Sequence, residues 1–203
     1  MTKRIKAKKK VSRSLGVNLW GRDNSPYIKR NSRPGQHGAN PRRYTNHSIH
    51  LLAKQKIKKY YNIRESQFRN LFFEAKRLKG NTEDDFAGLL ESRLCSIVYR
   101  ANMAPTIFSA RQLVSHKHIM VNGKTINIPS YIVSQGDIIS VSPNATNIVL
   151  INEALEKMER DIPAYLELNS TDKTVKFLNR PKADEIVYPF EPEFNAVVEY
   201  YSK

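Results

Sequence analysis

The stretch SARQLVSHKHIMVNGK, residues 109–124, begins as a helical segment and ends as a β-hairpin. Ser109 and Gln112 have the spacing of a capping box, so a helix is predicted to begin at Ala110. Asn122-Gly123 is a preferred two-residue hairpin turn, because both positions require a positive φ. This stretch therefore predicts a helix followed directly by antiparallel strands.

The same stretch is rich in cations and polar groups. Arg111 and Ser115 are four residues apart and project together from the helix, while His116 and Lys117 lie at its end and Lys124 follows the turn. A basic helix face beside a hairpin suits the backbone of a folded RNA. A cation at a helix C-terminus also stabilises the helix, so Lys117 has a purely structural interpretation as well.

Positive charge is concentrated in the N-terminal part of the chain. The 203 residues hold 34 Lys and Arg against 19 Asp and Glu, a formal charge of +15. Residues 1–60 contain 17 basic residues and one acidic residue, a net of +16, whereas residues 61–203 contain 17 basic and 18 acidic residues, a net of −1. A cationic arm on a nearly neutral body predicts a nucleic-acid binder, with a solvated basic tail as the alternative.

Residues 1–45 are expected to be an irregular arm, because Gly and Pro recur at short intervals. Such a segment buries too little apolar surface to compensate for the conformational entropy that it would lose on folding. We therefore expect it to fold only when it binds its partner. Within it, RPGQHGANPRR (residues 33–43) combines a tight loop with charge and donors for phosphates. The candidate RNA contacts of the arm are Lys8, Lys9, Lys10, Arg13, Arg33, Gln36, His37, Arg42 and Arg43.

A metal site and a disulfide framework are both disfavoured. His37, His47 and His50 do not have the spacing of a four-ligand zinc site, and the single Cys95 lies far from them. Cys95 sits within a helical apolar pattern and is interpreted as a buried residue, which is typical of a cytosolic protein. No apolar run reaches the roughly 20 residues of a membrane span, and the N-terminus lacks the apolar core of a secretory signal.

The segment LLAKQKIKKYYNI, residues 51–63, is predicted to be helical and carries no acid. Lys54 and Lys58 are spaced i,i+4, so they repel each other in an isolated helix, and a bound phosphate backbone would reverse that sign. A merely soluble helix face would normally intersperse acids. Lys54, Lys58 and Lys59 are therefore candidate RNA contacts.

Two further helices are expected, over residues 65–79 and from Thr82 to about Arg100. In the first, Arg69 and Lys76 lie off the apolar stripe and are either solvated or in contact with phosphate. In the second, Thr82 is the expected cap, and the acids of residues 83–85 suit the positive end of the helix dipole. These acids are thus interpreted as residues that stabilise the N-terminus of the helix, and not as a catalytic cluster.

Four motifs of the sequence resemble those of a known family. The runs QFRNLFFEAKRLKGNTEDDFAGLLESRL and ARQLVSHKHIMVNGKTINIPSY, the loop PGQHGA and the ending VEYYSK closely resemble bacterial small-subunit ribosomal protein four. The similarity spans nearly the whole chain. It implies a primary binder of small-subunit ribosomal RNA that nucleates assembly of the subunit body, without cofactor or enzymatic activity.

The resemblance also implies partners and site residues. It implies neighbouring small-subunit proteins and a place near the channel through which messenger RNA enters, with roles in translational accuracy and in repression of its own messenger. Arg42 and Arg43 are the candidates for unwinding messenger. By motif match the RNA-facing residues are Gln36, His37, Arg64, Gln67, Arg69, Arg111, Gln112, Ser115, His116, Lys117, Asn122 and Lys124.

The architecture implied by the resemblance is α+β. An extended basic arm (1–45) leads into a helical domain (46–91 and 178–203), into which a small RNA-binding module with an antiparallel sheet (92–177) is inserted. The family's four-Cys zinc knot is absent, so the chain resembles the zinc-free branch. Residues 132–203 carry 7 basic and 12 acidic residues, a net of −5, and are expected to face solvent or basic proteins.

The alternatives come from other classes of protein. An RNA-modifying enzyme, such as a pseudouridine synthase, uses the same module as an adaptor but needs a catalytic domain, for which little sequence remains here. Its best isolated acid, Asp137, follows a turn glycine and is interpreted as turn chemistry. A DNA or membrane-surface binder would bind without regard to sequence or shape.

Overall fold

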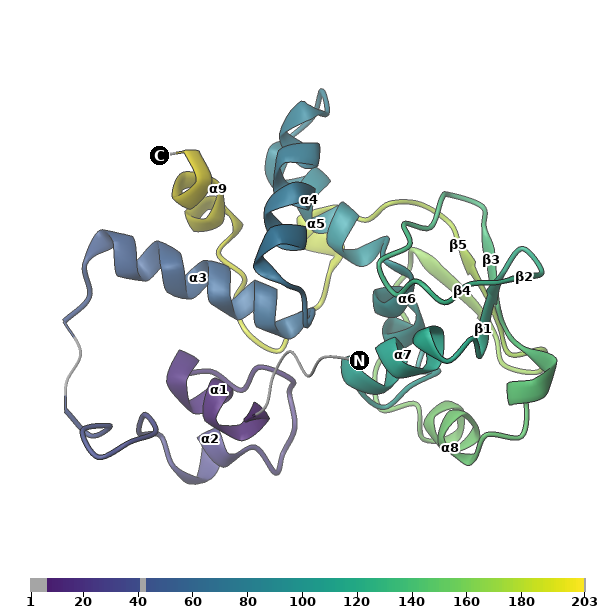
Figure 1. The fold of residues 1–203 in the computed structure, drawn as a ribbon, viewed down its shortest axis with the longest axis horizontal. Helices are drawn as coiled ribbons and strands as arrows, with labels where there is room; N and C mark the ends of the chain where they lie inside the picture. Colours follow the sequence, from purple (N-terminus) through teal and green to yellow (C-terminus); the bar gives the residue numbers. More distant parts are fainter. Residues whose placement is uncertain (1–6, 41–42, 203) are drawn as a thin grey trace. The chain divides into compact units, whose positions relative to one another are not determined.

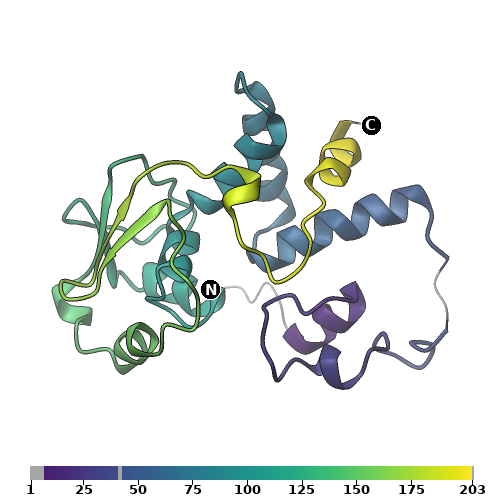
Figure 2. The same ribbon diagram turned by 180° about the vertical axis from the view of Figure 1, so that it is seen from behind.

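A computed structural model describes residues 7–40 and 43–202. The chain divides into two compact units, Met1–Asn70 with Tyr188–Lys203 and Leu71–Val187, and each is described by itself. Figures 1 and 2 show the helices and the single sheet from two sides. The described residues contain helices and an antiparallel sheet, which confirms the α+β class.

The first unit is helical. It contains α1 (Lys8–Leu15), α2 (Pro26–Lys29), α3 (Asn46–Tyr60), the start of α4 (Glu65–Arg77) and α9 (Phe194–Ser202). Helices α3 and α9 lie side by side in both views (Figures 1 and 2). Ala53 and Ile57 of α3 and Phe194 and Val197 of α9 are all buried.

The prediction of a wholly irregular arm is wrong for residues 8–15. This segment precedes the first glycine of the arm, so nothing in it prevents a helix. Gly16 ends α1 in the left-handed conformation, with φ 68°. Between Gly16 and α3, the described residues 17–40 and 43–45 contain one helix, the four-residue α2, in agreement with the prediction.

Helix α3 begins five residues earlier than predicted, at Asn46. Thr45 and Ser48 form a capping box: Thr45 Oγ1 accepts from the Ser48 amide at 3.3 Å, and Ser48 Oγ accepts from the Thr45 amide at 2.9 Å. This pairing satisfies two backbone donors that a helix N-terminus would otherwise expose. Helix α4 matches its predicted range closely.

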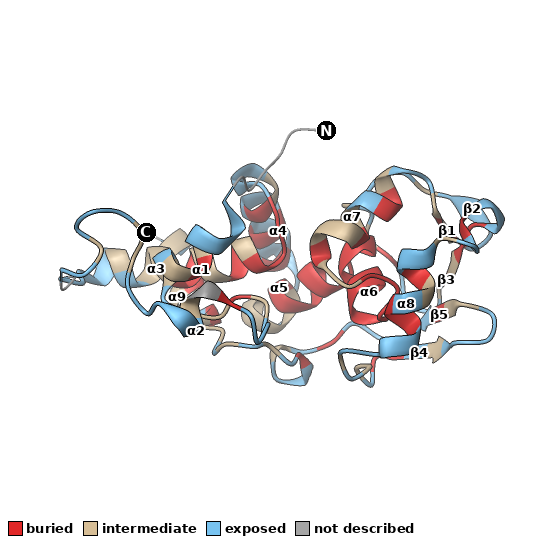
Figure 3. Ribbon diagram, turned by 90° about the horizontal axis from the view of Figure 1, so that it is seen from below, coloured by how far each residue is buried: buried red, intermediate tan, exposed pale blue. Residues whose placement is uncertain are grey.

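The second unit combines helices with a five-stranded antiparallel sheet in the order β2-β1-β3-β5-β4. The strands are β1 (Ile119–Val121), β2 (Lys124–Thr125), β3 (Ile138–Val141), β4 (Leu166–Asn169) and β5 (Thr174–Phe177). The helices are the rest of α4, α5 (Thr82–Glu91), α6 (Leu94–Arg100), α7 (Ile107–Ser115) and α8 (Val149–Lys157). Two short 3-10 turns complete it, Pro143–Ala145 and Ala183–Glu185. Helices α6 and α7 pack together beside the sheet (Figures 1 and 2), and Figure 3 shows burial concentrated in α5, α6 and the inner side of α7.

The predicted single helix from Thr82 to Arg100 is two helices. Arg93 is extended and bridges Ile132, while the Leu94 amide donates to the Tyr131 carbonyl and the Val133 amide to the Ser92 carbonyl, both at 2.8 Å. This pairing with a distant segment interrupts the helical hydrogen bonds. The cap of α5 also differs from the prediction, because Asn81 and not Thr82 accepts from the Glu83 amide.

The predicted start of the next helix is wrong by three residues. Helix α7 begins at Ile107, and its capping box pairs Thr106 with Ser109, each hydroxyl accepting from the other's amide at 3.0 Å. Gln112 takes no part in it. The hairpin is confirmed, since β1 pairs with β2 through Val121 and Lys124.

Candidate nucleic-acid interface

The C-terminal end of α7 is held by a backbone motif that presents Lys117. The His118 amide donates to the Leu113 carbonyl at 3.1 Å, and the Lys117 amide donates to the Val114 carbonyl at 3.0 Å. Lys117 itself is left-handed, with φ 64°, at the position where helices most often have glycine. Lys117 therefore follows the helix in a conformation that is uncommon for residues other than glycine, and its side chain is exposed.

Five polar side chains of the predicted set lie on α7, at its C-terminal end or in the hairpin that follows, and we call them the α7 basic end: Arg111, Gln112, His116, Lys117 and Lys124. All except the half-buried Arg111 are exposed. Among the described residues, neither Lys117 nor Lys124 forms an ion pair with an acid. The structure therefore places most of the predicted set on α7 and the hairpin after it, and it leaves the charges of Lys117 and Lys124 available to an anion.

Ser115 and Asn122 of the predicted set are engaged within the protein. Ser115 Oγ donates to the Arg111 carbonyl at 2.9 Å. Asn122 Nδ2 donates to Asp137 Oδ1 at 2.8 Å, and Asn122 Oδ1 accepts from the Ile138 amide at 2.9 Å. Asn122 is also left-handed, with φ 49°, as the hairpin turn requires. These contacts favour a structural role for Asn122 and confirm Asp137 as part of a turn.

The loop after Arg33 is compact. The Arg33 guanidinium donates to the Asn40 carbonyl at 2.7 Å and thereby closes residues 33–40. A Cβ on Gly38 would lie 1.9 Å from the Arg33 carbonyl oxygen, so only glycine fits this approach. Gln36 and His37 are exposed on the closed loop, in agreement with their predicted availability.

Arg13 of α1 fastens this loop to the first helix. Its Nε donates to the Ser32 carbonyl at 2.9 Å, and a terminal nitrogen donates to the Arg33 carbonyl at 3.2 Å. A polar pocket of about 290 Å³ lies beside it, and its lining includes both arginines and residues 14–16 and 38–40. Arg13 and Arg33 thus shape the arm and also border a pocket, where their positive charge would attract an anion.

The other basic residues of the arm that the structure describes are exposed. Lys8, Lys9 and Lys10 occupy the first turn of α1, and Arg43 follows the loop. Arg42 lies outside the described residues. Sequence reasoning omitted three exposed cations, Arg22, Lys29 and Arg30, which the charge pattern of the arm already indicated.

Lys54 and Lys58 do not form a free basic face, contrary to the prediction. Their side chains are buried, with residue exposures of 4% and 8%, and both ammonium groups bind Glu65 at the start of α4. Lys54 also lies 4.1 Å from the centre of the Tyr200 ring. The acid that the α3 segment lacks is supplied by the next helix, so these two lysines are internal partners.

Glu65 is the centre of this cluster. Burial alone would raise the pKa of Glu65, but hydrogen bonds from Lys54, Lys58 and Tyr201 lower it to about 2. Burial and the hydrogen bond to Glu65 raise the pKa of Tyr201 above its ordinary value. Burial, then the neighbouring charge of Lys58, lower the pKa of the half-buried Lys59. The cluster ties α3, α4 and α9 of the first unit together.

The basic side chains of α4 are mostly exposed. Arg64, Arg69 and Lys76 are at the surface, whereas Gln67 is half-buried. Sequence reasoning missed the exposed Arg77 and Lys79 at the end of this helix, which the same helical spacing would have found. No group of three or more His, Cys, Asp or Glu side chains suited to a metal occurs in residues 7–40 and 43–202. Within the same residues, no helix has the length and apolarity needed to cross a membrane.

The fold and these surfaces define an α+β protein that presents exposed cations on ordered elements. Residues 3–91 match the "Ribosomal protein S4/S9 N-terminal domain", and residues 92–139 match the "S4 domain". The chain is 49% identical to small ribosomal subunit protein uS4 of Pelagibacter ubique and 48% identical to that of Rickettsia prowazekii, in both cases over the full length of both chains. It is 45% identical to that of Ehrlichia chaffeensis over 98% of this chain and 99% of the relative. The chain belongs to the uS4 family of small ribosomal subunit proteins.

Proposed function

We propose that this chain is a structural constituent of the small ribosomal subunit and binds small-subunit ribosomal RNA in the cytoplasm. The observation that carries the proposal is the α7 basic end, where Lys117 adopts a left-handed conformation and exposes its charge beside the hairpin. Ammonium, imidazole and amide donors on ordered elements suit phosphate and ribose oxygens of a folded RNA. Membership of the uS4 family supports the same function.

The arm supplies a second RNA-binding surface in this proposal. The exposed lysines of α1, the closed loop with Gln36 and His37, and Arg43 concentrate positive charge on the first unit. We assign the arm to residues 1–45, the helical domain to residues 46–91 and 178–203, and the RNA-binding module to residues 92–177. Lys54, Lys58 and Asn122 are left out of the RNA-facing set because of their internal contacts.

The proposal has a finer part. By family resemblance, the chain nucleates assembly of the subunit body and lies near the channel through which messenger RNA enters, beside other small-subunit proteins. Roles in translational accuracy and in repression of its own messenger belong to the same resemblance. Arg43, exposed after the loop, is the described residue that we assign to messenger contact.

The family is a structural one, so the chain is not an enzyme. The isolated acid that an RNA-modifying enzyme would need, Asp137, accepts hydrogen bonds from Asn122 and from the Ser134 amide. Both of its oxygens thus serve the turn. This use of Asp137 supports the RNA-binding function over the enzymatic alternative.

Binding to purified small-subunit ribosomal RNA tests the proposal. The full chain is expected to bind tightly, to protect a defined set of nucleotides in chemical footprinting, and to lose affinity steeply as salt rises, because several phosphates are neutralised. The control is an unrelated duplex RNA of equal length at matched salt. Equal affinity for both RNAs, with no footprint, would show that the chain binds RNA through its net charge alone, without specificity.

A further inference from the structure

Helix α8 has an apolar side that the described residues leave uncovered. Its inner side buries Ile151, Ala154 and Leu155 in the second unit. On its outer side Val149 is 66% exposed and Leu150 38%. Met158, directly after the helix, is 47% exposed. Three exposed large apolar side chains within ten residues make a patch of the kind that marks an interaction site.

A groove lies next to this patch. It separates α8 from residues 102–105, has a volume of about 360 Å³, and is lined by Pro105, Val149, Leu150, Glu153, Ala154 and Lys157, with Arg160 at its end. The apolar atoms of α8 therefore continue from the helix surface into a depression. We call the groove and the exposed side of the helix together the α8 groove.

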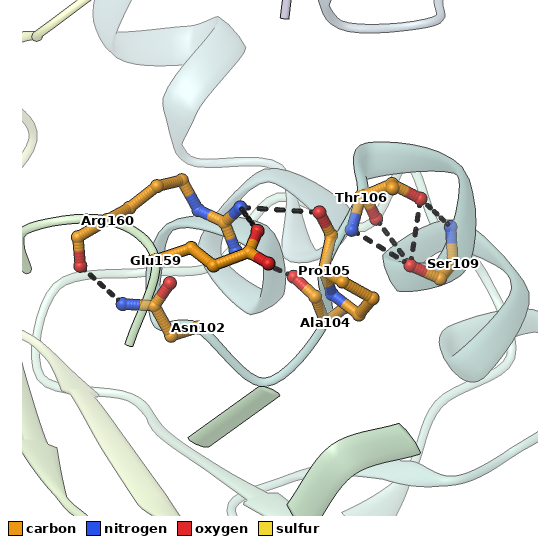
Figure 4. A network of polar contacts seen from close by, with 7 residues as sticks. All are labelled: Asn102, Ala104, Pro105, Thr106, Ser109, Glu159 and Arg160. Carbon is orange, nitrogen blue, oxygen red and sulfur yellow. Dashed lines mark hydrogen bonds and ion pairs between the residues drawn. The ribbon is translucent and has the colours of Figure 1, made fainter. Parts of the chain in front are cut away.

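The far wall of the α8 groove is fixed by Arg160 (Figure 4). The Arg160 guanidinium donates to the Ala104 carbonyl at 2.8 Å and to the Pro105 carbonyl at 3.3 Å, and it lies 4.1 Å from the centre of the Tyr99 ring. Asn102 Nδ2 donates back to the Arg160 carbonyl at 2.6 Å. The wall is thus ordered before any partner arrives, which lowers the entropy lost on binding.

The left-handed Met158 makes this arrangement possible. It ends α8 with φ 37° and ψ 56°, a conformation that is uncommon for residues other than glycine. The chain turns there, so that Arg160 reaches residues 104 and 105 while the Met158 side chain stays at the surface. The same turn therefore fixes the groove and keeps an apolar side chain exposed.

The charge around the α8 groove is negative. Glu153, Glu156, Glu159 and Asp161 are all exposed, and the cations on or against this part of the chain are Lys157, Arg160 and Lys173. The Arg160 guanidinium is engaged with two carbonyls and a ring and lies 3.9 Å from the Glu159 carboxylate, and the Lys173 ammonium donates to Asn152 at 2.7 Å. Glu153, Glu156 and Asp161 therefore outnumber the one remaining cation, Lys157. This edge has the opposite sign to the α7 basic end and would repel a phosphate backbone.

We propose that the α8 groove binds a basic amphipathic segment of a neighbouring protein in the small subunit. An apolar side chain of that segment fills the groove, and its Lys or Arg residues pair with Glu153 and Glu156. A small molecule confined to the groove would leave Met158, which does not line it, uncovered, whereas a protein segment can cover Met158 as well. The inference rests on the proposed function, because it requires the chain to be in the ribosomal particle.

Photo-crosslinking in assembled subunits tests the inference. Leu150 is replaced by p-benzoylphenylalanine in the full chain, small subunits are reconstituted, and light-dependent products are identified by mass spectrometry. The expected product joins residue 150 to a protein segment that contains Lys or Arg. Crosslinks to ribosomal RNA alone, or no product above the unirradiated sample, would overturn the inference while incorporation of the chain still supports the proposed function.

Charge reversal supplies a second readout. Adding Glu153→Lys and Glu156→Lys to the crosslinking chain is expected to lower the yield of the protein product at least about fivefold, since each lost charge pair weakens the contact. The matched control adds Glu74→Lys and Glu191→Lys, which change the net charge equally at exposed sites elsewhere. An equal yield from both chains would refute the charge pairing. Failure of the wild-type chain to enter the particle would overturn the proposed function itself.

Discussion

Helix α3 and the α7 basic end are similarly basic in sequence but differ in how their charges are used. In α3, Lys54 and Lys58 are buried against Glu65, and Lys56 binds Glu193 at 2.7 Å. At the α7 basic end, Lys117 and Lys124 are exposed and, in the part of the chain that the structure describes, pair with no acid. A basic run therefore indicates a binding surface only where the fold supplies no internal anion.

The largest expected effect comes from removing the exposed charges of the α7 basic end. The double variant Lys117→Gly with Lys124→Ala is expected to weaken ribosomal RNA binding by about 2 kcal/mol, roughly 30-fold, through two lost charged hydrogen bonds. Filter binding at fixed salt measures it. Glycine suits the left-handed position, so the urea midpoint of Lys117→Gly alone should be unchanged or higher. Unchanged RNA affinity in the folded double variant would show that this surface is only solvated.

The converse variant acts on α3. Lys54→Ala removes a buried stem and one of the two cations on Glu65, and is expected to cost about 1.5 kcal/mol of stability. Its RNA affinity at 25 °C should stay within about twofold of wild type, because this cation already has an internal partner. Urea unfolding and filter binding on the same preparation measure the two quantities. A loss of RNA affinity as large as that of the α7 double variant would erase the distinction between the two regions.

The pH dependence of stability tests whether Glu65 is the internal anion of the α3 lysines. The pKa of Glu65 is about 2 in the folded protein against an ordinary 4.5, so its contribution is fully present above pH 4.5 and is lost as pH falls toward 2. Because the carboxylate is half-exposed, we expect this contribution to be only about 1 kcal/mol. Urea unfolding of wild type and Glu65→Gln should show a gap at pH 6 that narrows below pH 4.5. A gap that widens on acidification would contradict this assignment of Glu65.

The smallest expected effects concern how α7 begins. Thr106→Ala should destabilise the protein by about 1 kcal/mol, since it removes the side-chain acceptor for the Ser109 amide. Gln112→Ala should change stability by less than about 0.5 kcal/mol, because this exposed residue takes no part in the cap. Thermal unfolding of both variants measures the difference. A larger loss of stability for Gln112→Ala than for Thr106→Ala would indicate that Ser109 and Gln112 form the capping box after all.

Local patterns predicted much of the fold and of the site. The hairpin turn, the apolar stripe of α4, the burial of Cys95 and the exposed polar end of α7 follow from residue spacing alone. The break between α5 and α6 does not, because it depends on pairing of Arg93 with Ile132, far along the chain. The internal role of Asn122 likewise depends on Asp137, which lies fifteen residues away.

The sequence by itself determined the excess of positive charge in the first 60 residues, the helix and hairpin around residues 107–125, and membership of the uS4 family. Only the tertiary structure decided which cations remain free, since an ion pair such as Lys58 with Glu65 joins residues of different helices. It also decided that α8 carries an acidic and apolar edge beside a preformed groove. The physical reason is that spacing along the chain fixes local geometry, whereas the neutralisation of a charge and the covering of an apolar face depend on which distant segments the fold brings beside them.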